Sequence, residues 1–166
     1  MKKKIIIGTR GSKLALIYAK IAEKNINKFK SRFSIKSVSI KKVITKGDKI
    51  QNKRLSDIGG KGLFTKKIEN ELLNKKIDIA VHALKDIPSK ESEKFYTNCF
   101  LKRNDPREVL ITRKKQKFKN LPKNSVIGTS SFRREYQLKR IRKDLVYKLI
   151  RGNVDTRIKK LNNKIY

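Results

Sequence analysis

Residues 5–22, IIIGTRGSKLALIYAKIA, give the clearest indication of the fold class. Residues 5–7 form a short β-branched run that ends at Gly8, which predicts a strand. Ser12 follows and can cap a helix. We expect the apolar face of that helix to consist of residues at helical spacing, namely Leu14, Ile17, Tyr18, Ile21 and Ala22. A strand followed directly by an amphipathic helix is typical of an α/β domain.

The same alternation continues along the chain. In the first part we expect a strand over residues 35–44, a helix with Phe64, Ile68 and Leu72 on one face, and a buried strand over residues 78–82. In the last third we expect strands over residues 125–128 and 145–150, and helices over residues 131–141 and 154–161. Strands that alternate with helices predict parallel sheets and the α/β fold class.

Two less regular segments separate these elements. Residues 46–62 contain glycines without periodicity and are expected to form a loop, and residues 96–112 are expected to be extended. We expect a domain boundary near residues 99–105. Domain 1 would then cover residues 1–99, and residues 100–166 would be the opening part of a second, incomplete α/β domain.

The charge of the chain is strongly positive but unevenly informative. The 166 residues include 46 Lys plus Arg and 14 Asp plus Glu, a formal charge of +32. The 34 lysines are spread evenly, as on a solvated surface, whereas nine of the 12 arginines lie in residues 101–166. Because arginine binds carboxylates and phosphates in a bidentate manner, the second part is expected to bind anions. Nucleic acid is the alternative partner, but no basic patch interleaved with aromatic residues supports it, so we expect none.

Several classes of protein are excluded by what the sequence lacks. It has no run of about 18 apolar residues and no secretory signal, so we expect a cytoplasmic protein without a membrane partner. A single cysteine cannot form an internal disulfide, and with a single histidine it leaves no zinc cluster and no expected metal site. Cys99 lies beside Phe100 in an apolar segment and is expected to be a buried thiol.

Polar clusters follow three of the expected strands, at residues 8–12, 128–134 and 151–157. N–H groups at helix starts, hydroxyls and guanidinium groups suit carboxylate or phosphate ligands. In the alternative interpretation, Ser12, Ser130 and Asn153 are ordinary helix caps and the arginines are solvated. Open α/β sheets bind ligands at the carboxyl ends of their strands, which favours a binding site.

Two further segments each allow two interpretations. Residues 59–62 are glycine-rich without the spacing of a phosphate-binding loop, so they are either a lid that carries Lys61 or a plain turn. Lys85 and Asp86 follow the expected strand at residues 78–82, and Asp86 could stabilise a developing positive charge or form a structural ion pair. His82 is either a core histidine or a proton carrier.

Seven motifs together resemble the hydroxymethylbilane synthase (porphobilinogen deaminase) family. They are IGTRGSKLAL (7–16), TKGD (45–48), GGKGLFTKKIE (59–69), DIAVHALKDIP (78–88), NDPRE (104–108), VIGTSSFRREYQL (126–138) and LIRGNVDTRIKKL (149–161). The family joins four porphobilinogen molecules head to tail with release of ammonia, and it builds the product on a dipyrromethane cofactor. The resemblance therefore implies porphobilinogen as substrate and dipyrromethane as cofactor.

The resemblance also implies roles for particular residues of these motifs. Asp86 matches the catalytic aspartate, which stabilises the cation that forms when ammonia leaves. The residues implied to bind carboxylates of substrate or cofactor, Gly152 and Asn153 through their backbone, are Arg10, Ser12, Lys61, Lys85, Thr129, Ser130, Ser131, Arg133, Arg134, Arg151, Gly152, Asn153 and Arg157. The segment from residue 46 to residue 62 would be the active-site lid, with Lys61 as a candidate ligand.

The resemblance implies two domains of the periplasmic-binding-protein type (type II) with the active site in the cleft between them, and a third domain that we expect to be absent. We expect a monomer at full length. Many relatives have serine where this chain has Ala83, so one polar contact is expected to be missing. The cysteine that carries the cofactor belongs to the third domain, and Cys99 is not its counterpart. We therefore expect this chain to be inactive alone, and the alternative function is a module that binds anions without catalysis.

Overall fold

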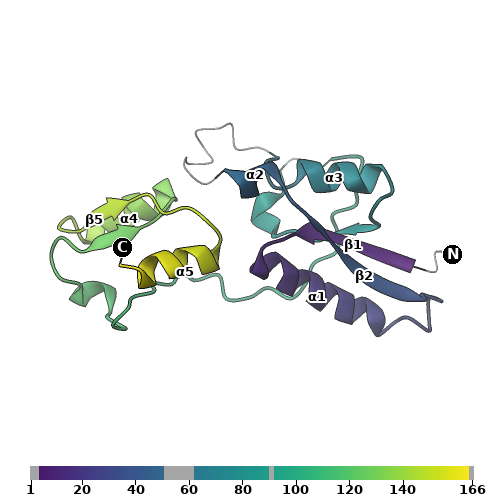
Figure 1. The fold of residues 1–166 in the computed structure, drawn as a ribbon, viewed down its shortest axis with the longest axis horizontal. Coiled ribbons are helices and arrows are strands. Elements are labelled where there is room, and N and C mark those ends of the chain that lie inside the picture. Colours follow the sequence, from purple (N-terminus) through teal and green to yellow (C-terminus); the bar gives the residue numbers. More distant parts are fainter. Residues whose placement is uncertain (1–3, 51–61, 90–91, 165–166) are drawn as a thin grey trace. The chain divides into compact units, whose positions relative to one another are not determined.

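A computed structural model describes residues 4–50, 62–89 and 92–164 of the chain (Figure 1). The chain divides into two compact units. The first is formed by Met1–Ile50 with Gly59–Lys102, and the second contains Arg103–Tyr166.

The first unit is built on a three-stranded parallel sheet in the order β2-β1-β3. Its strands are β1 (Lys4–Arg10), β2 (Ser37–Val43) and β3 (Ile79–Ala80), and its longer helices are α1 (Lys13–Asn27) and α3 (Lys66–Leu73). The chain passes from the central strand to one edge and then back across to the other edge. Because crossovers between parallel strands are right-handed, this reversal puts α1 and α3 on opposite faces of the sheet, as Figure 1 shows.

The core of the first unit lies on both faces of β1. On the side of α1, Ile7 of β1 and Ala19 of α1 have no exposed surface. Toward α3, a buried cluster contains Val43, Ile68 and Ile77, with Ile6, Leu72 and Ala80 packed against it. The side chains of successive strand residues point to opposite faces, so Ile6 and Ile7 serve these two halves of the core.

The prediction of which face of α1 is buried is largely wrong. Leu14, Ile17 and Ile21 are 46%, 54% and 42% exposed, whereas Ala19 is fully buried. The helix turns its alanines toward the sheet, because small side chains allow its backbone to lie close to the strands. Periodicity located the helix, but the size of the residues decided which face is buried.

Two other expectations for the first unit need correction. The buried strand expected over residues 78–82 is reduced to the two residues of β3, and their side chains are only half-buried. The loop expected over residues 46–62 begins with a short helix, α2 (Lys46–Lys49). Its acidic residue Asp48 lies in the first turn, where a negative charge is favourable. Residues 51–61, which include Lys61, lie outside the described residues.

The second unit repeats the strand–helix alternation on a smaller scale. Strands β4 (Val126–Gly128) and β5 (Val146–Lys148) are parallel and in register from Val126 opposite Val146. Helices α4 (Phe132–Ile141) and α5 (Val154–Asn162) follow them. The ends of these four elements lie within two residues of the expected ones, and the buried core consists of Ile127, Leu145 and Ile150.

The chain that leads into the second unit is extended and exposed. Tyr96 is 98% exposed and Val109 is 81% exposed. Cys99 is also exposed, which corrects the expectation of a buried thiol. Its apolar neighbours indicated burial, but no described element packs over this stretch. No helix among the described residues combines the length and the apolar character that a membrane span requires.

Candidate functional site

The carboxyl ends of β1 and β3 bring the first group of predicted residues together. Arg10 is the last residue of β1, and Asp86 ends the short 3₁₀ helix η2 (Leu84–Asp86) that follows β3. In the strand order β2-β1-β3, the connection that leaves β1 and the connection that enters β3 run across the sheet in opposite directions, so a topological switch point lies between these two parallel strands. Such a switch point is where open parallel sheets bind ligands.

The guanidinium group of Arg10 is held by two carboxylates and one aromatic ring. Its Nε and Nη2 donate to Oδ1 of Asp48 at 3.1 and 2.5 Å. Its Nη1 lies 3.6 Å from Oδ2 of Asp86. The ring of Phe64 lies below it, 3.9 Å from the guanidinium carbon to the ring centre, in cation–π geometry. The side chains of all three charged residues are at most 17% exposed.

Asp48 is anchored by its own helix start. Its Oδ2 accepts hydrogen bonds from the backbone N–H of Thr45 at 3.2 Å and from the Thr45 hydroxyl at 2.7 Å. Partial burial alone would raise the pKa of Asp48, but the hydrogen bonds from Arg10 and Thr45 outweigh it and lower the pKa below its ordinary value of 3.8. Asp48 is therefore a carboxylate at neutral pH. The sequence motif TKGD, which contains Asp48, was identified, but no role was predicted for Asp48.

The other predicted residues of the first unit take different positions. Ser12 is the N-cap of α1, and its side chain accepts a hydrogen bond from the N–H of Ala15 at 3.3 Å. It therefore acts as an ordinary helix cap, which was the alternative interpretation of this residue. Lys85 is exposed beside Asp86. Thr9 was not predicted, yet it is fully buried, and its hydroxyl donates to the carbonyl of Val81 at 3.3 Å. That bond joins β1 to the chain that follows β3.

His82 follows β3 by two residues, and it is half-buried. Its Nε2 is buried and has no hydrogen-bond partner among the described residues. Burial lowers the pKa of His82 below 6.5, and nearby Arg10 acts in the same direction against the opposing influence of Glu69 and Asp86. His82 is therefore neutral at pH 7.

In the second unit, the loops after β4 and β5 carry most of the predicted residues. Thr129 is buried, and its N–H and carbonyl bond to Lys148 and Ile150, which ties the two loops together. Ser131, and not Ser130, is the N-cap of α4, and its Oγ accepts from the N–H of Arg134 at 3.4 Å. The cap position depends on where helical dihedral angles begin, which the run of adjacent serines does not reveal.

Arg157 connects these loops to α5. Its Nε donates to the carbonyl of Gly152 at 2.8 Å, and its Nη2 donates to Oγ of Ser130 at 3.3 Å. Gly152 has φ of +112°, and a Cβ there would lie 2.8 Å from Cγ2 of Thr156. A side chain at residue 152 would therefore be strained and crowded. Asn153 is the N-cap residue of α5, with no hydrogen bond from its side chain to the helix.

Positive charge accumulates around Arg157. Burial lowers its pKa, and the nearby charges of Arg151 and Arg134 lower it further. Burial also lowers the pKa of Arg151. Nε of Arg134 is buried and has no partner among the described atoms. The positive charges of Arg151 and Arg134 disfavour the charged form of Arg157, and an anion placed beside Arg157 would offset this repulsion.

One carboxylate of the chain already lies against this cluster. Glu108 pairs with Arg134 at 2.5 Å and with Arg133 at 3.5 Å, and all three side chains are at least 43% exposed. The sequence did not lead us to predict Glu108 as a partner of these arginines. The available signal was the acidic end of the NDPRE motif, one of few acidic positions in a basic segment.

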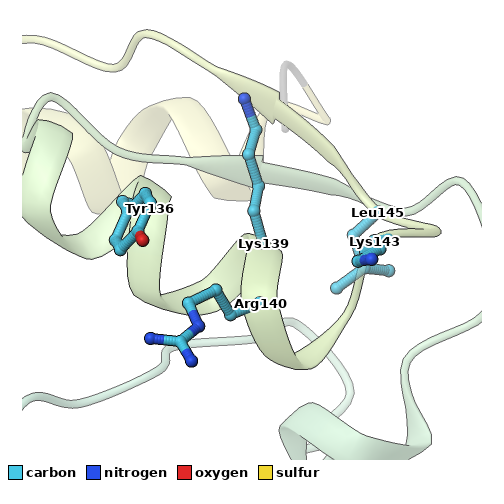
Figure 2. Close-up of a pocket in the computed structure, with 5 residues that line it drawn as sticks. All are labelled: Tyr136, Lys139, Arg140, Lys143 and Leu145. Carbon is cyan, nitrogen blue, oxygen red and sulfur yellow. The ribbon is translucent and has the colours of Figure 1, made fainter.

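Other features of the described residues do not add to the site. A surface pocket of about 380 Å³ in the second unit is lined by Tyr136, Lys139, Arg140, Lys143 and Leu145, none of them a predicted site residue. Figure 2 shows that Lys139 and Arg140 point away from one another, so their charges do not converge on one ligand. No group of three or more metal-binding side chains occurs among residues 4–50, 62–89 and 92–164.

The fold and these loops define an α/β protein with parallel sheets whose strand ends carry arginines, hydroxyls and acidic residues. Residues 5–166 match the family described as porphobilinogen deaminase, dipyromethane cofactor binding domain. The chain belongs to the porphobilinogen deaminase family, as its motifs predicted.

Curated relatives support the same assignment. The chain is 51% identical over 161 residues to a porphobilinogen deaminase of Rickettsia prowazekii, covering 97% of this chain and 53% of that protein. It is 44% identical over 164 residues to the porphobilinogen deaminase of an Exiguobacterium species, covering 99% of this chain and 53% of that protein. The chain therefore spans about half the length of the curated relatives it matches.

Proposed function

We propose that this chain supplies the residues that bind carboxylates, and the catalytic aspartate, for porphobilinogen condensation. The observation that carries the proposal is the position of Arg157, which is hydrogen-bonded to Ser130 and to the carbonyl of Gly152 and lies near the positive charges of Arg151 and Arg134. Porphobilinogen carries an acetate and a propionate, so each unit added to the growing product brings two carboxylates. Partly desolvated guanidinium groups bind such ligands strongly.

The residues of the second unit fit a dipyrromethane cofactor, because its carboxylates match the donors present. Those that would hold it are Thr129, Ser130, Ser131, Arg133, Arg134, Arg151, Gly152, Asn153 and Arg157. When bound, the cofactor supplies the pyrrole to which the first porphobilinogen is joined. Cys99 is exposed in the first unit, and no role in attachment is assigned to it.

Asp86 would act on the substrate in the first unit. Loss of ammonia from porphobilinogen leaves positive charge on the pyrrole, and a carboxylate that is only 14% exposed can stabilise this charge strongly. Arg10 and Lys85 would bind the substrate carboxylates, with Ser12 at the start of α1 and Lys61 as further ligands. We further propose that residues 1–99 belong to the first and residues 100–166 to the second of two periplasmic-binding-protein-like (type II) domains, and that the enzyme is a monomer.

The test joins this chain to the remaining half of the Rickettsia prowazekii relative and measures ammonia and tetrapyrrole formation from porphobilinogen. We expect turnover by the fusion and none by its Asp86→Asn variant, with porphobilinogen binding retained. Turnover by Asp86→Asn equal to that of the parent would reject the catalytic assignment. Binding without turnover in the parent fusion would favour the alternative, an anion-binding module without catalysis.

A further inference from the structure

We propose that Asp48 is a positioning residue, which holds the guanidinium group of Arg10 and balances its charge so that Asp86 keeps its own negative charge for the reaction. This inference rests on the proposed role of Asp86. It extends that role to a residue of the TKGD motif that would not itself touch the substrate.

The geometry around Arg10 is unequal. Two of its three guanidinium nitrogens donate to a single oxygen of Asp48, at 3.1 and 2.5 Å. The third nitrogen lies 3.6 Å from Asp86, which is an ion pair beyond hydrogen-bond distance. Asp48 is therefore the main partner of Arg10, and Asp86 is a secondary one.

The sum of charges gives this inequality a chemical consequence. Asp48, Arg10 and Asp86 together carry a net charge of −1 when both acids are ionised. Without the charge of Asp48 the group would be neutral, and among the described residues Asp86 would be the carboxylate left beside Arg10. The guanidinium would then approach Asp86, and a carboxylate in a tight ion pair stabilises a cationic pyrrole less.

The surroundings keep Asp48 and Arg10 in place. The second oxygen of Asp48 is occupied by two hydrogen bonds from Thr45, so the carboxylate cannot rotate without losing them. The guanidinium of Arg10 also packs against the face of the Phe64 ring. A Cβ at Gly47 would lie 2.3 Å from Cε1 of that ring, so only glycine leaves room for it.

The first arm of the experiment uses the 166-residue chain and follows the Nε–Hε signal of Arg10 by NMR. We expect a signal protected from exchange with water in the parent chain and its loss in Asp48→Asn. Glu71→Gln is the matched control, because Glu71 pairs with Lys41 in the same unit at 2.5 Å but is remote from this group of charges. A protected signal that persists in Asp48→Asn overturns the inference.

The second arm measures turnover in the fusion used to test the proposed function. Misplacing a reacting group costs on the order of 10- to 100-fold in rate, and we expect a fall of this size in kcat for Asp48→Asn with KM little changed. Asp48→Glu should recover part of kcat because it restores the charge. Unchanged kcat in Asp48→Asn, or a fall that Asp48→Glu does not improve, overturns the inference.

Two features keep the outcomes separate. Thr45→Val keeps the charge of Asp48 and removes one of its anchors, so a smaller fall in kcat is expected even if Asp48→Asn does not fold. If the parent fusion shows no turnover, the proposed function has failed. The NMR arm then still decides whether Asp48 holds Arg10.

Discussion

Nη2 of Arg157 lies 3.3 Å from Oγ of Ser130, and this hydrogen bond joins helix α5 to the loop that follows β4. The two residues are 27 positions apart in the sequence and belong to two different polar clusters. The second bond of the same guanidinium, to the carbonyl of Gly152, fixes its plane. The two polar clusters of the second unit are therefore in direct contact.

Arg157 should be the strongest single contributor to anion binding in the second unit. A hydrogen bond between charged groups contributes about 1.5–3 kcal/mol, so Arg157→Gln should weaken porphobilinogen binding about 10- to 100-fold. Isothermal titration calorimetry of the 166-residue chain measures this. Arg113→Gln removes an exposed arginine of the same unit and is the control. Equal losses in both variants would mean that only the overall charge matters.

Removal of Glu108 should have the opposite effect. This residue is the internal counter-charge of Arg134, so Glu108→Gln leaves more of the arginine charge to a ligand. The pair is exposed, and such pairs contribute little to stability. We expect tighter porphobilinogen binding, by a few-fold at low salt, with an unchanged thermal midpoint. Weaker binding would show that Glu108 orients the arginine for the ligand.

Gly8 should tolerate no side chain in the core of the first unit. A Cβ at this position would lie 2.3 Å from Cδ1 of Ile77. Overpacking of this kind costs about 1–3 kcal/mol, so Gly8→Ala should lower the free energy of unfolding by that amount in urea titrations. Ile77→Val deletes Cδ1. The double variant should therefore lose less free energy of unfolding than the sum of the losses in the two single variants. Strict additivity would locate the cost elsewhere.

His82 should make stability depend on pH below neutrality. Burial lowers its pKa in the folded chain below 6.5, so the unfolded chain binds the proton more readily in the interval between the two pKa values. The free energy of unfolding should therefore fall as the pH drops from 7.5 through 6.5, until the folded pKa is reached. His82 is the only histidine, so His82→Gln should flatten the dependence. An unchanged slope in that variant would assign it to other groups.

Local patterns in the sequence predicted most of the elements. The β-branched run at residues 5–7 and the capping residue Ser12 are short-range signals, and both β1 and α1 formed where they predicted. The predictions of the extent of β3 and of the buried face of α1 were wrong. Both depend on what packs against the element, and periodicity within the element carries no information about that.

The family, the alternation of strands and helices, and the types of residue that follow each strand can all be predicted from the amino-acid sequence. The pairings of distant residues cannot: Arg10 meets Asp48 across 38 positions, and Arg157 meets Ser130 across 27. These pairs form because strand order and register bring distant loops together at one edge of a sheet. A hydrogen bond depends on that placement to within a few tenths of an ångström.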